Sequence, residues 1–206
     1  MFVKICGITN QADAEGVIAA GADALGFNFW PGSERYLEPA EAAEWIRELP
    51  DTVIRVAVLV NPSPAYAKEI AAIDGIDCLQ LHGAESPEFC QSLVESQVPL
   101  WKAIPMAERE MALPDFHTNR LLLDSVAGTK FGGTATRFPW SWASHLIVAN
   151  PAREFILAGG LNPENLAEAI NQVRPFGVDV ASGVEVRPGH KDIYRVRDFI
   201  TAARSV

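Results

Sequence analysis

Cys6 is the residue whose type and position could most readily do chemistry. It ends a short apolar segment at the start of the chain, Gly7 follows it, and Asn10 with Asp13 predicts a helix start just beyond. A thiol at a strand-to-helix junction is held on rigid backbone and can face a pocket, where its thiolate form is a nucleophile or a base. The alternative interpretation is a buried cysteine that packs as a small hydrophobic side chain.

Other side chains with chemical potential stand at the ends of later apolar runs. Asp124 closes a leucine-rich run, where an unpaired carboxylate would be costly to bury. It either caps the following turn or serves as a general acid or base opposite Cys6. Arg35 is either a solvated loop charge or a fork for a carboxylate. His82 is either a hydrogen-bonded wall residue or a participant in the reaction.

Two glycine-containing loops suggest a phosphate site. Gly159 and Gly160 follow the seventh apolar run, and Ser182 and Gly183 follow the eighth. Glycine lets a backbone approach a ligand closely, and a helix that begins soon after offers free N–H groups and the positive end of its dipole. Either loop alone could be a tight turn. Both together predict a phosphate ester bound through backbone groups, as in barrels whose last two loops hold phosphate.

These residues need a framework of alternating strands and helices. Eight short apolar runs lie at residues 3–6, 24–28, 53–60, 78–81, 100–104, 121–124, 155–158 and 178–180. Stretches of helical period lie at residues 11–20, 39–49, 64–73, 87–96, 139–148, 163–173 and 194–204. Residues 105–119 carry two prolines and weak periodicity, so the helix expected there should be short or distorted. Residues 128–140, rich in Gly and Thr, should form a long mobile loop.

This order predicts an α/β fold, a single (β/α)8 TIM barrel spanning residues 1–206, with its phosphate site at the loops after strands 7 and 8. Eight units in 206 residues lie at the compact end of the barrel size range. The alternative is a doubly wound open sheet. That fold usually has fewer strands, and no Gly-x-Gly-x-x-Gly follows the first run.

The amino-acid composition of the chain limits the kinds of partner that it can bind. The chain has 26 acidic and 17 basic residues, a net charge of −9 and no basic block, which argues against nucleic acid and anionic membranes. No export signal or apolar run long enough to cross a bilayer is present. The three cysteines lack zinc-site spacing, so we expect a cytoplasmic protein with no metal and no cofactor. Cys78 and Cys90 should be structural.

Taken in order, the motifs resemble those of phosphoribosylanthranilate isomerase, an enzyme family of tryptophan biosynthesis. The similarity covers essentially the whole chain and rests on the following segments: Lys4-Ile-Cys-Gly-Ile-Thr9, Gly26-Phe-Asn-Phe29, Ser33-Glu-Arg-Tyr36, Val58-Leu-Val-Asn61, Leu79-Gln-Leu-His-Gly83, Leu123-Asp-Ser125, Gly132-Gly-Thr134, Leu157-Ala-Gly-Gly-Leu-Asn-Pro163, Gly177-Val-Asp-Val-Ala-Ser-Gly-Val-Glu185 and Pro188-Gly-His-Lys-Asp192. Each segment is weak evidence alone. Their shared order is specific.

The resemblance implies a cofactor-free Amadori rearrangement of N-(5′-phosphoribosyl)anthranilate. Asp124 would protonate the furanose ring oxygen and open the ring to a Schiff base, and Cys6 would remove the C2′ proton to give an enolamine that becomes the ketone. Arg35 would hold the anthranilate carboxylate. We expect the phosphoribosyl substrate to contact the following residues: Arg35, His82, Gly159, Gly160, Ser182 and Gly183. The protein would act as a monomer or a homodimer.

Three positions depart from the family pattern: Glu34, Ala135 and Ala181. Glu34 replaces a usual proline beside Arg35 and could weaken the positive charge there. Ala135 replaces a common glycine and could alter the loop after strand 6. Ala181 replaces a frequent serine, so one side-chain contact to phosphate could be missing.

The sequence leaves two alternatives to the isomerase function open. A carbon–carbon lyase on the same fold would depend on strand-end lysines and glutamates, with Lys4 or Lys102 as a possible Schiff-base residue or merely the partner of an acid. A non-catalytic phosphosugar-binding barrel would keep the glycine loops but would not need Cys6 or Asp124.

Overall fold

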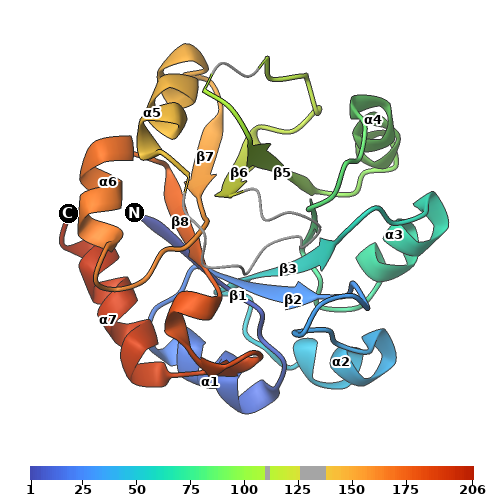
Figure 1. Cartoon of the computed structure of the whole chain (residues 1–206). Helices are drawn as coiled ribbons and strands as arrows, with labels where there is room; N and C mark the ends of the chain where they lie inside the picture. The colour runs from blue at the N-terminus through green and yellow to red at the C-terminus, as the bar shows by residue number, and fades with distance from the viewer. Residues whose placement is uncertain (110–111, 126–137) are drawn as a thin grey trace.

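Parallel strands form a closed barrel around the centre of the molecule (Figure 1). The computed structural model describes residues 1–109, 112–125 and 138–206. Within these ranges the barrel strands are eight: β1 (Phe2–Cys6), β2 (Ala24–Asn28), β3 (Ile54–Leu59), β4 (Cys78–Leu81), β5 (Leu100–Met106), β6 (Arg120–Ser125), β7 (Glu154–Leu157) and β8 (Gly177–Val180). β1 pairs with β2 and also with β8, which closes the barrel. The TIM-barrel prediction is therefore confirmed.

Helices surround this barrel (Figure 1). The helices in the described residues are α1 (Gln11–Ala19), α2 (Pro39–Ile46), α3 (Pro64–Ala71), α4 (Pro87–Glu95), α5 (Trp140–Ala149), α6 (Leu166–Val173) and α7 (Ile193–Arg204). After β8 come a short 3₁₀ helix, η1 (Ser182–Val184), and a hairpin of β9 (Glu185–Arg187) with β10 (His190–Lys191). This hairpin is an addition to the simple βα repeat.

Local chemistry explains where several helices begin. The hydroxyls of Ser63 and Ser86 accept the backbone N–H of the third residue beyond them, and proline follows each serine. The expected helix start at residue 163 is too early. Asn162 and Asn165 each accept the other's backbone N–H with their side chains, which forms a turn before α6 starts.

The expectation of a helix between strands 5 and 6 is also wrong for the residues described. β5 continues through Pro105, and no helix forms in the described part of residues 107–119. Pro105 can occupy the strand because its place in the ladder needs no N–H donation, whereas a helix interior would need one. The predicted loop at residues 128–140 lies mainly outside the described residues.

The apolar side chains form two layers. The larger core lies between the strands and the helices, and a smaller cluster fills the barrel with residues such as Val56, Leu122 and Ile156. Alternation along β1 places Phe2, Lys4 and Cys6 on the same side of the strand. Cys78 and Cys90 are buried, as expected.

At the amino-terminal end of the barrel, aromatic rings surround one arginine. The guanidinium carbon of Arg120 lies 5.1 Å from the ring centroid of Phe2, 4.9 Å from that of Trp101 and 5.0 Å from that of Phe176. Arg120 also pairs with Glu154 at 2.5 Å. This arrangement seals the end of the barrel opposite the strand-end residues.

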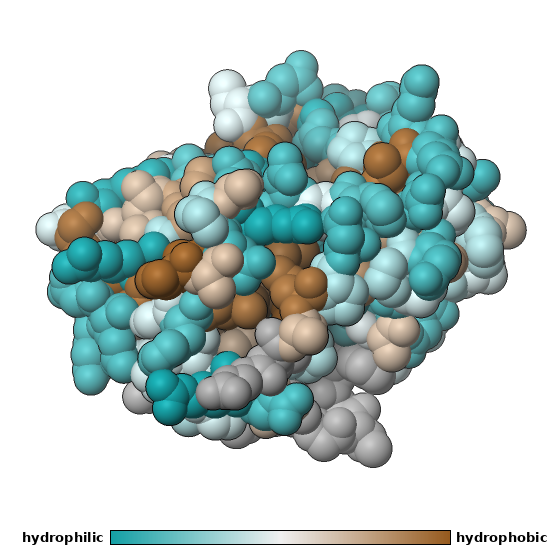
Figure 2. Space-filling view, turned by 90° about the horizontal axis from the view of Figure 1, so that it is seen from above, coloured by the Kyte–Doolittle hydropathy of each residue, from teal (hydrophilic) through white to brown (hydrophobic). Residues whose placement is uncertain are grey.

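One face of the molecule is mainly polar. Figure 2 shows a largely hydrophilic face with hydrophobic side chains reaching the surface in patches between the polar ones. No helix in the described part of the chain is long and apolar enough to cross a membrane.

Candidate active site

Cys6 lies at the carboxyl end of β1, opposite Gly26 of β2 in the strand register. A side chain at position 26 would not fit, because a Cβ there would lie 2.6 Å from the Cys6 Sγ and 3.1 Å from the Lys4 Nζ. Glycine at this position therefore leaves room for the thiol and for a lysine in the barrel interior. Cys6 is partly exposed, so a ligand can reach it.

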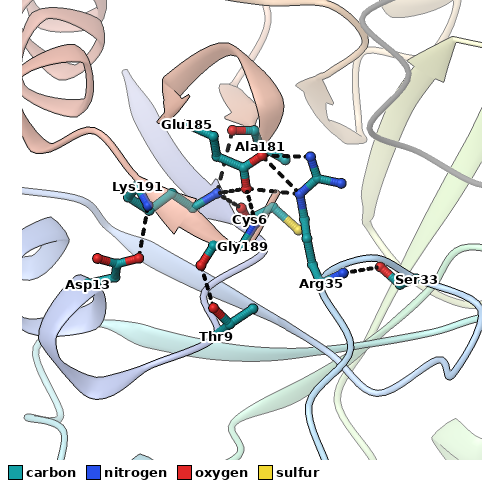
Figure 3. Close-up of polar contacts among 9 residues, drawn as sticks. All are labelled: Cys6, Thr9, Asp13, Ser33, Arg35, Ala181, Glu185, Gly189 and Lys191. Atoms are coloured by element: carbon teal, nitrogen blue, oxygen red, sulfur yellow. Dashed lines mark hydrogen bonds and ion pairs between the residues drawn. The ribbon is translucent and has the colours of Figure 1, made fainter. Parts of the chain in front are cut away.

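A set of charged side chains surrounds the thiol. Lys4, which is fully buried, forms an ion pair with Asp179 of β8 at 2.8 Å. Lys191 of β10 reaches in from the hairpin and donates to the Cys6 carbonyl oxygen at 2.6 Å and to Glu185 at 2.7 Å (Figure 3). Figure 3 shows the sulfur on the side of Arg35.

Arg35 is bound along one edge and open along the other. Its Nε and Nη2 donate to the carboxylate of Glu185 at 2.9 Å and 2.6 Å. Nη1 has no hydrogen bond among the described residues, and Figure 3 shows this nitrogen turned away from Glu185. The guanidinium can therefore hold Glu185 and present its Nη1 side to a second carboxylate.

The groups around Cys6 shift the pKa of its thiol in opposite directions. Burial raises the pKa of Cys6 above its ordinary value, and Asp179 adds to this, whereas Lys4 and Lys191 lower it. Burial lowers the pKa of Lys191, and Glu185 only partly offsets that effect. The pKa of Lys4 is raised, because Asp179 and Cys6 outweigh the effect of burial. The free protein thus holds mainly a thiol, with cations placed to stabilise the thiolate.

Asp124 is the penultimate residue of β6 and belongs to a chain of three polar side chains. Its Oδ1 accepts the Ser125 backbone N–H at 2.7 Å, and its Oδ2 lies 3.0 Å from the His82 Nε2. The other ring nitrogen of His82, Nδ1, lies 2.9 Å from the Nε2 of Gln80. The turn-cap interpretation and the acid interpretation of Asp124 are therefore compatible, since each uses a different oxygen.

A cavity joins Asp124 to the two loops predicted to bind phosphate. Its lining comprises Asp124, Ser125, Ala158, Gly159, Gly160, Leu161, Asp179, Val180, Ala181 and Ser182. The backbone N–H groups of Gly159 and Gly160 make no hydrogen bond to any other described residue. Gly159 has φ +84°, and a Cβ there would lie 2.9 Å from the Ser125 nitrogen, so glycine is needed for this loop to approach β6.

Some expected site residues lie elsewhere. Gly183 does not line this cavity and packs against the Leu161 carbonyl oxygen, where any Cβ would clash. Lys102 is buried against Glu85 at 3.0 Å, so neither it nor Lys4 is a free amine. Glu34 is exposed. Ala135 and the motif Gly132-Gly-Thr134 lie outside the described residues.

The sequence interpretation missed the roles of Glu185 and Lys191. A signal was present, because Pro188 and Gly189 mark a tight turn between them and Gly189 has φ +77°. That turn predicts a hairpin that returns Lys191 toward Glu185. Asp179 could also have been paired with Lys4 had the first and last strands been placed side by side. Within the described residues, no group of three or more His, Cys, Asp or Glu side chains could hold a metal ion.

The fold and this site define a TIM-barrel enzyme with a thiol and a carboxyl group at the mouth that carries its glycine loops. The family described as "PRAI: N-(5'phosphoribosyl)anthranilate (PRA) isomerase" matches residues 3–202. The N-(5'-phosphoribosyl)anthranilate isomerase of Geobacter sp. (strain M21) is 43% identical over 204 residues, which are 99% of this chain and 98% of the relative. The chain therefore belongs to the phosphoribosylanthranilate isomerase family.

Solved structures agree with this assignment. Monomers generated from the dimeric phosphoribosylanthranilate isomerase of Thermotoga maritima are 40% identical, with a TM-score of 0.87 and all of both chains covered. Another solved structure is of a phosphoribosylanthranilate isomerase in complex with reduced 1-(o-carboxyphenylamino)-1-deoxyribulose 5-phosphate. It is 38% identical, with a TM-score of 0.84 and all of both chains covered.

Proposed function

We propose that this isomerase converts N-(5′-phosphoribosyl)anthranilate to 1-(2-carboxyphenylamino)-1-deoxyribulose 5-phosphate, the step of its family in tryptophan biosynthesis, with Asp124 as general acid and Cys6 as general base. The observation that carries the proposal is the position of both groups. Each lies at the carboxyl end of a parallel strand, so both are near the same barrel mouth, and Asp124 lines the cavity of the glycine loops.

In the first step Asp124 gives the proton on Oδ2 to the furanose ring oxygen. The C1′–O bond breaks, and the nitrogen lone pair forms the C1′=N bond of a protonated Schiff base. Oδ1 is held by the Ser125 N–H, which keeps Oδ2 as the oxygen available for proton transfer. Because the carboxylate left after transfer lies beside His82, the developing charge has a hydrogen-bond partner.

In the second step the Cys6 sulfur removes the C2′ proton. The C–H electron pair forms a C1′=C2′ bond, and the iminium electrons return to nitrogen, which gives the enolamine. The base need not be strong, because the iminium makes this proton acidic. Lys4 and Lys191 stabilise the thiolate, and with Arg35 they make three cations against the two anions Asp179 and Glu185.

Two further groups orient the substrate in this proposal. The open side of Arg35 receives the anthranilate carboxylate while Glu185 holds its other edge. The free N–H groups of Gly159 and Gly160, with the loop at Ser182, receive the phosphate. The structure of a family member with a reduced carboxyphenylamino deoxyribulose phosphate supports a ligand of this class. His82 contributes through Asp124.

The proposal treats residues 1–206 as one domain, since β1 and β8 pair and Arg204 donates to the Met1 carbonyl oxygen, which joins the two ends. It acts on a small phosphoribosyl molecule, as a monomer or a homodimer. Dimeric and monomeric forms of the Thermotoga maritima relative support either state. The ion-paired state of Lys4 and Lys102 argues against a Schiff-base lyase.

Loss of substrate fluorescence tests the proposal. Wild type should turn over phosphoribosylanthranilate, and Cys6→Ser and Asp124→Asn should each lower kcat by at least about 100-fold while substrate binding is largely kept. Cys78→Ser and Asp115→Asn are the matched controls, because Cys78 is buried away from the mouth and Asp115 is exposed. Undiminished turnover in either test variant would disprove the acid–base pair, and an inactive wild type would disprove the function.

A further inference from the structure

Gln80 is a buried polar residue that the proposed mechanism does not use. It lies on β4, its side chain has no exposed surface, and its Oε1 has no hydrogen-bond partner among the described residues. A buried carbonyl oxygen without a partner is costly, so its presence in the barrel interior calls for a reason. Its amide nitrogen supplies one, because it lies 2.9 Å from the His82 Nδ1.

The three side chains form one continuous path. Gln80 and His82 are two residues apart, so β4 directs both to the barrel interior, and His82 reaches Asp124 on β6 at 3.0 Å. The His82 side chain is 15% exposed and that of Asp124 9%. The hydrogen positions of each side chain limit those of the next, because a ring nitrogen of neutral His82 can either donate or accept a hydrogen bond but not both.

Two arrangements of hydrogen atoms fit these positions. When the Gln80 NH2 group faces Nδ1, that nitrogen is an acceptor, so Nε2–H donates to an ionised Asp124. When the amide makes half a turn, Oε1 accepts from Nδ1–H. Nε2 can then accept the proton of a neutral Asp124 carboxyl group, a state that holds one proton more, taken from solvent. The half turn moves no other heavy atom; it gives Oε1 a donor and puts the NH2 group in the place that Oε1 held.

We propose that Gln80 is a positioning residue for the acid step. Its amide fixes the His82 ring against Asp124, and by presenting Oε1 to Nδ1 it allows the His82–Asp124 pair to hold the proton that this step consumes. The inference rests on the proposed function, since it assigns the acid role to Asp124. A purely structural glutamine would stabilise the barrel without affecting which ring nitrogen carries the proton.

The experiment compares Gln80→Met and Gln80→Glu with wild type. Methionine keeps the length of the side chain but offers Nδ1 no strong partner, and we expect kcat to fall about 10- to 100-fold with KM changed by less than about threefold. Glutamate offers acceptors only, so it should keep Nδ1 protonated and recover part of the lost kcat. Cys78→Ala, on the same inner side of β4, should leave kcat unchanged.

Nitrogen-15 spectra of the histidine rings give a readout that does not depend on turnover. Comparison with His82→Gln identifies the His82 signals among the 4 histidines. We expect Gln80→Glu to shift the proton toward Nδ1 and Gln80→Met to give a mixture of ring forms. If the ring signals of His82 in Gln80→Met match those of wild type, or if Gln80→Met keeps wild-type kcat, the inference is wrong. An inactive wild type would instead count against the proposed function, while the spectra still test Gln80.

Discussion

Lys4 and Asp179 form an ion pair beside Cys6, and removing one or the other should shift the pKa of the Cys6 thiol in opposite directions. Asp179 raises the pKa of Cys6 and Lys4 lowers it. Asp179→Asn should therefore lower the pKa of Cys6, because Lys4 loses its carboxylate partner and is left to interact with the thiolate. Lys4→Met should raise it. The rate of iodoacetamide alkylation as a function of pH measures both shifts, with a Cys6→Ser background to identify the reacting thiol.

The same two variants should change stability in the same direction. The charges lie 2.8 Å apart, with side-chain exposures of 0% and 9%. By Coulomb's law the attraction at this distance is roughly 6 kcal/mol at an effective dielectric constant of about 20, before the cost of desolvation, and removing one partner of a buried pair costs about 3–5 kcal/mol. Each single variant should lose about that much in chemical denaturation. The double variant Lys4→Met/Asp179→Asn should lose less than the sum, since neither charge is then left alone.

This combination separates an electrostatic effect from general loosening of the barrel mouth. Loosening would expose Cys6 in both variants and would move its alkylation profile the same way in both. Profiles that shift in one common direction would therefore refute the electrostatic reasoning. Additive stability losses would show that the two charges do not interact as the 2.8 Å contact indicates.

Three further results should follow from the structure. Gly26→Ala should lower kcat by roughly 100-fold, because its Cβ would displace the Cys6 sulfur, and a misplacement of about 1 Å is enough for such a loss; unchanged kinetics would contradict this close approach. Arg120→Met should cost about 1–3 kcal/mol from its contacts with three rings, as seen by denaturant unfolding, but leave kcat unchanged because it lies at the opposite barrel end. Since the pKa of Cys6 is raised, the thiolate fraction and kcat/KM should rise from neutral into alkaline pH, and a flat kcat/KM profile would contradict a thiolate base. The same shift means that Cys6 lowers the free energy of unfolding at pH values above the ordinary thiol pKa.

The sequence was enough to predict where single residues lie when their place depends on one strand end at a time. Cys6 and Asp124 could be placed because each follows an apolar run, and the carboxyl ends of parallel strands share one barrel mouth. The glycine loops were found for the same reason. The missing helix after β5 was harder to predict, because Pro105 permits an extended strand as readily as it prevents a helix.

Contacts between distant strands could not be read from local patterns. Lys4 and Asp179 meet only because the barrel closes between β1 and β8, and Arg35 meets Glu185 only because the final hairpin folds back over β1. The residues around Lys4 in the sequence do not include Asp179, and the loop of Arg35 does not include Glu185. Expecting Arg35 to hold a substrate carboxylate was reasonable from its forked shape, but nothing in its own loop indicated that Glu185 already binds one edge of the guanidinium.

Under the proposed mechanism, these distant pairs explain how a thiol can serve as a base in a site that disfavours its charge. A permanently ionised Cys6 would need a strong excess of positive charge around it. Such a site would also attract the carboxylate and the phosphate of the substrate to the wrong positions. Here Asp179 and Glu185 offset most of the charge of Lys4, Arg35 and Lys191, so burial still raises the thiol pKa. In the proposed complex the substrate carboxylate would add a third anion at Arg35, and the protonated Schiff base would bring a new cation next to the sulfur. In this arrangement the iminium formed in the first step supplies the charge that favours proton removal in the second.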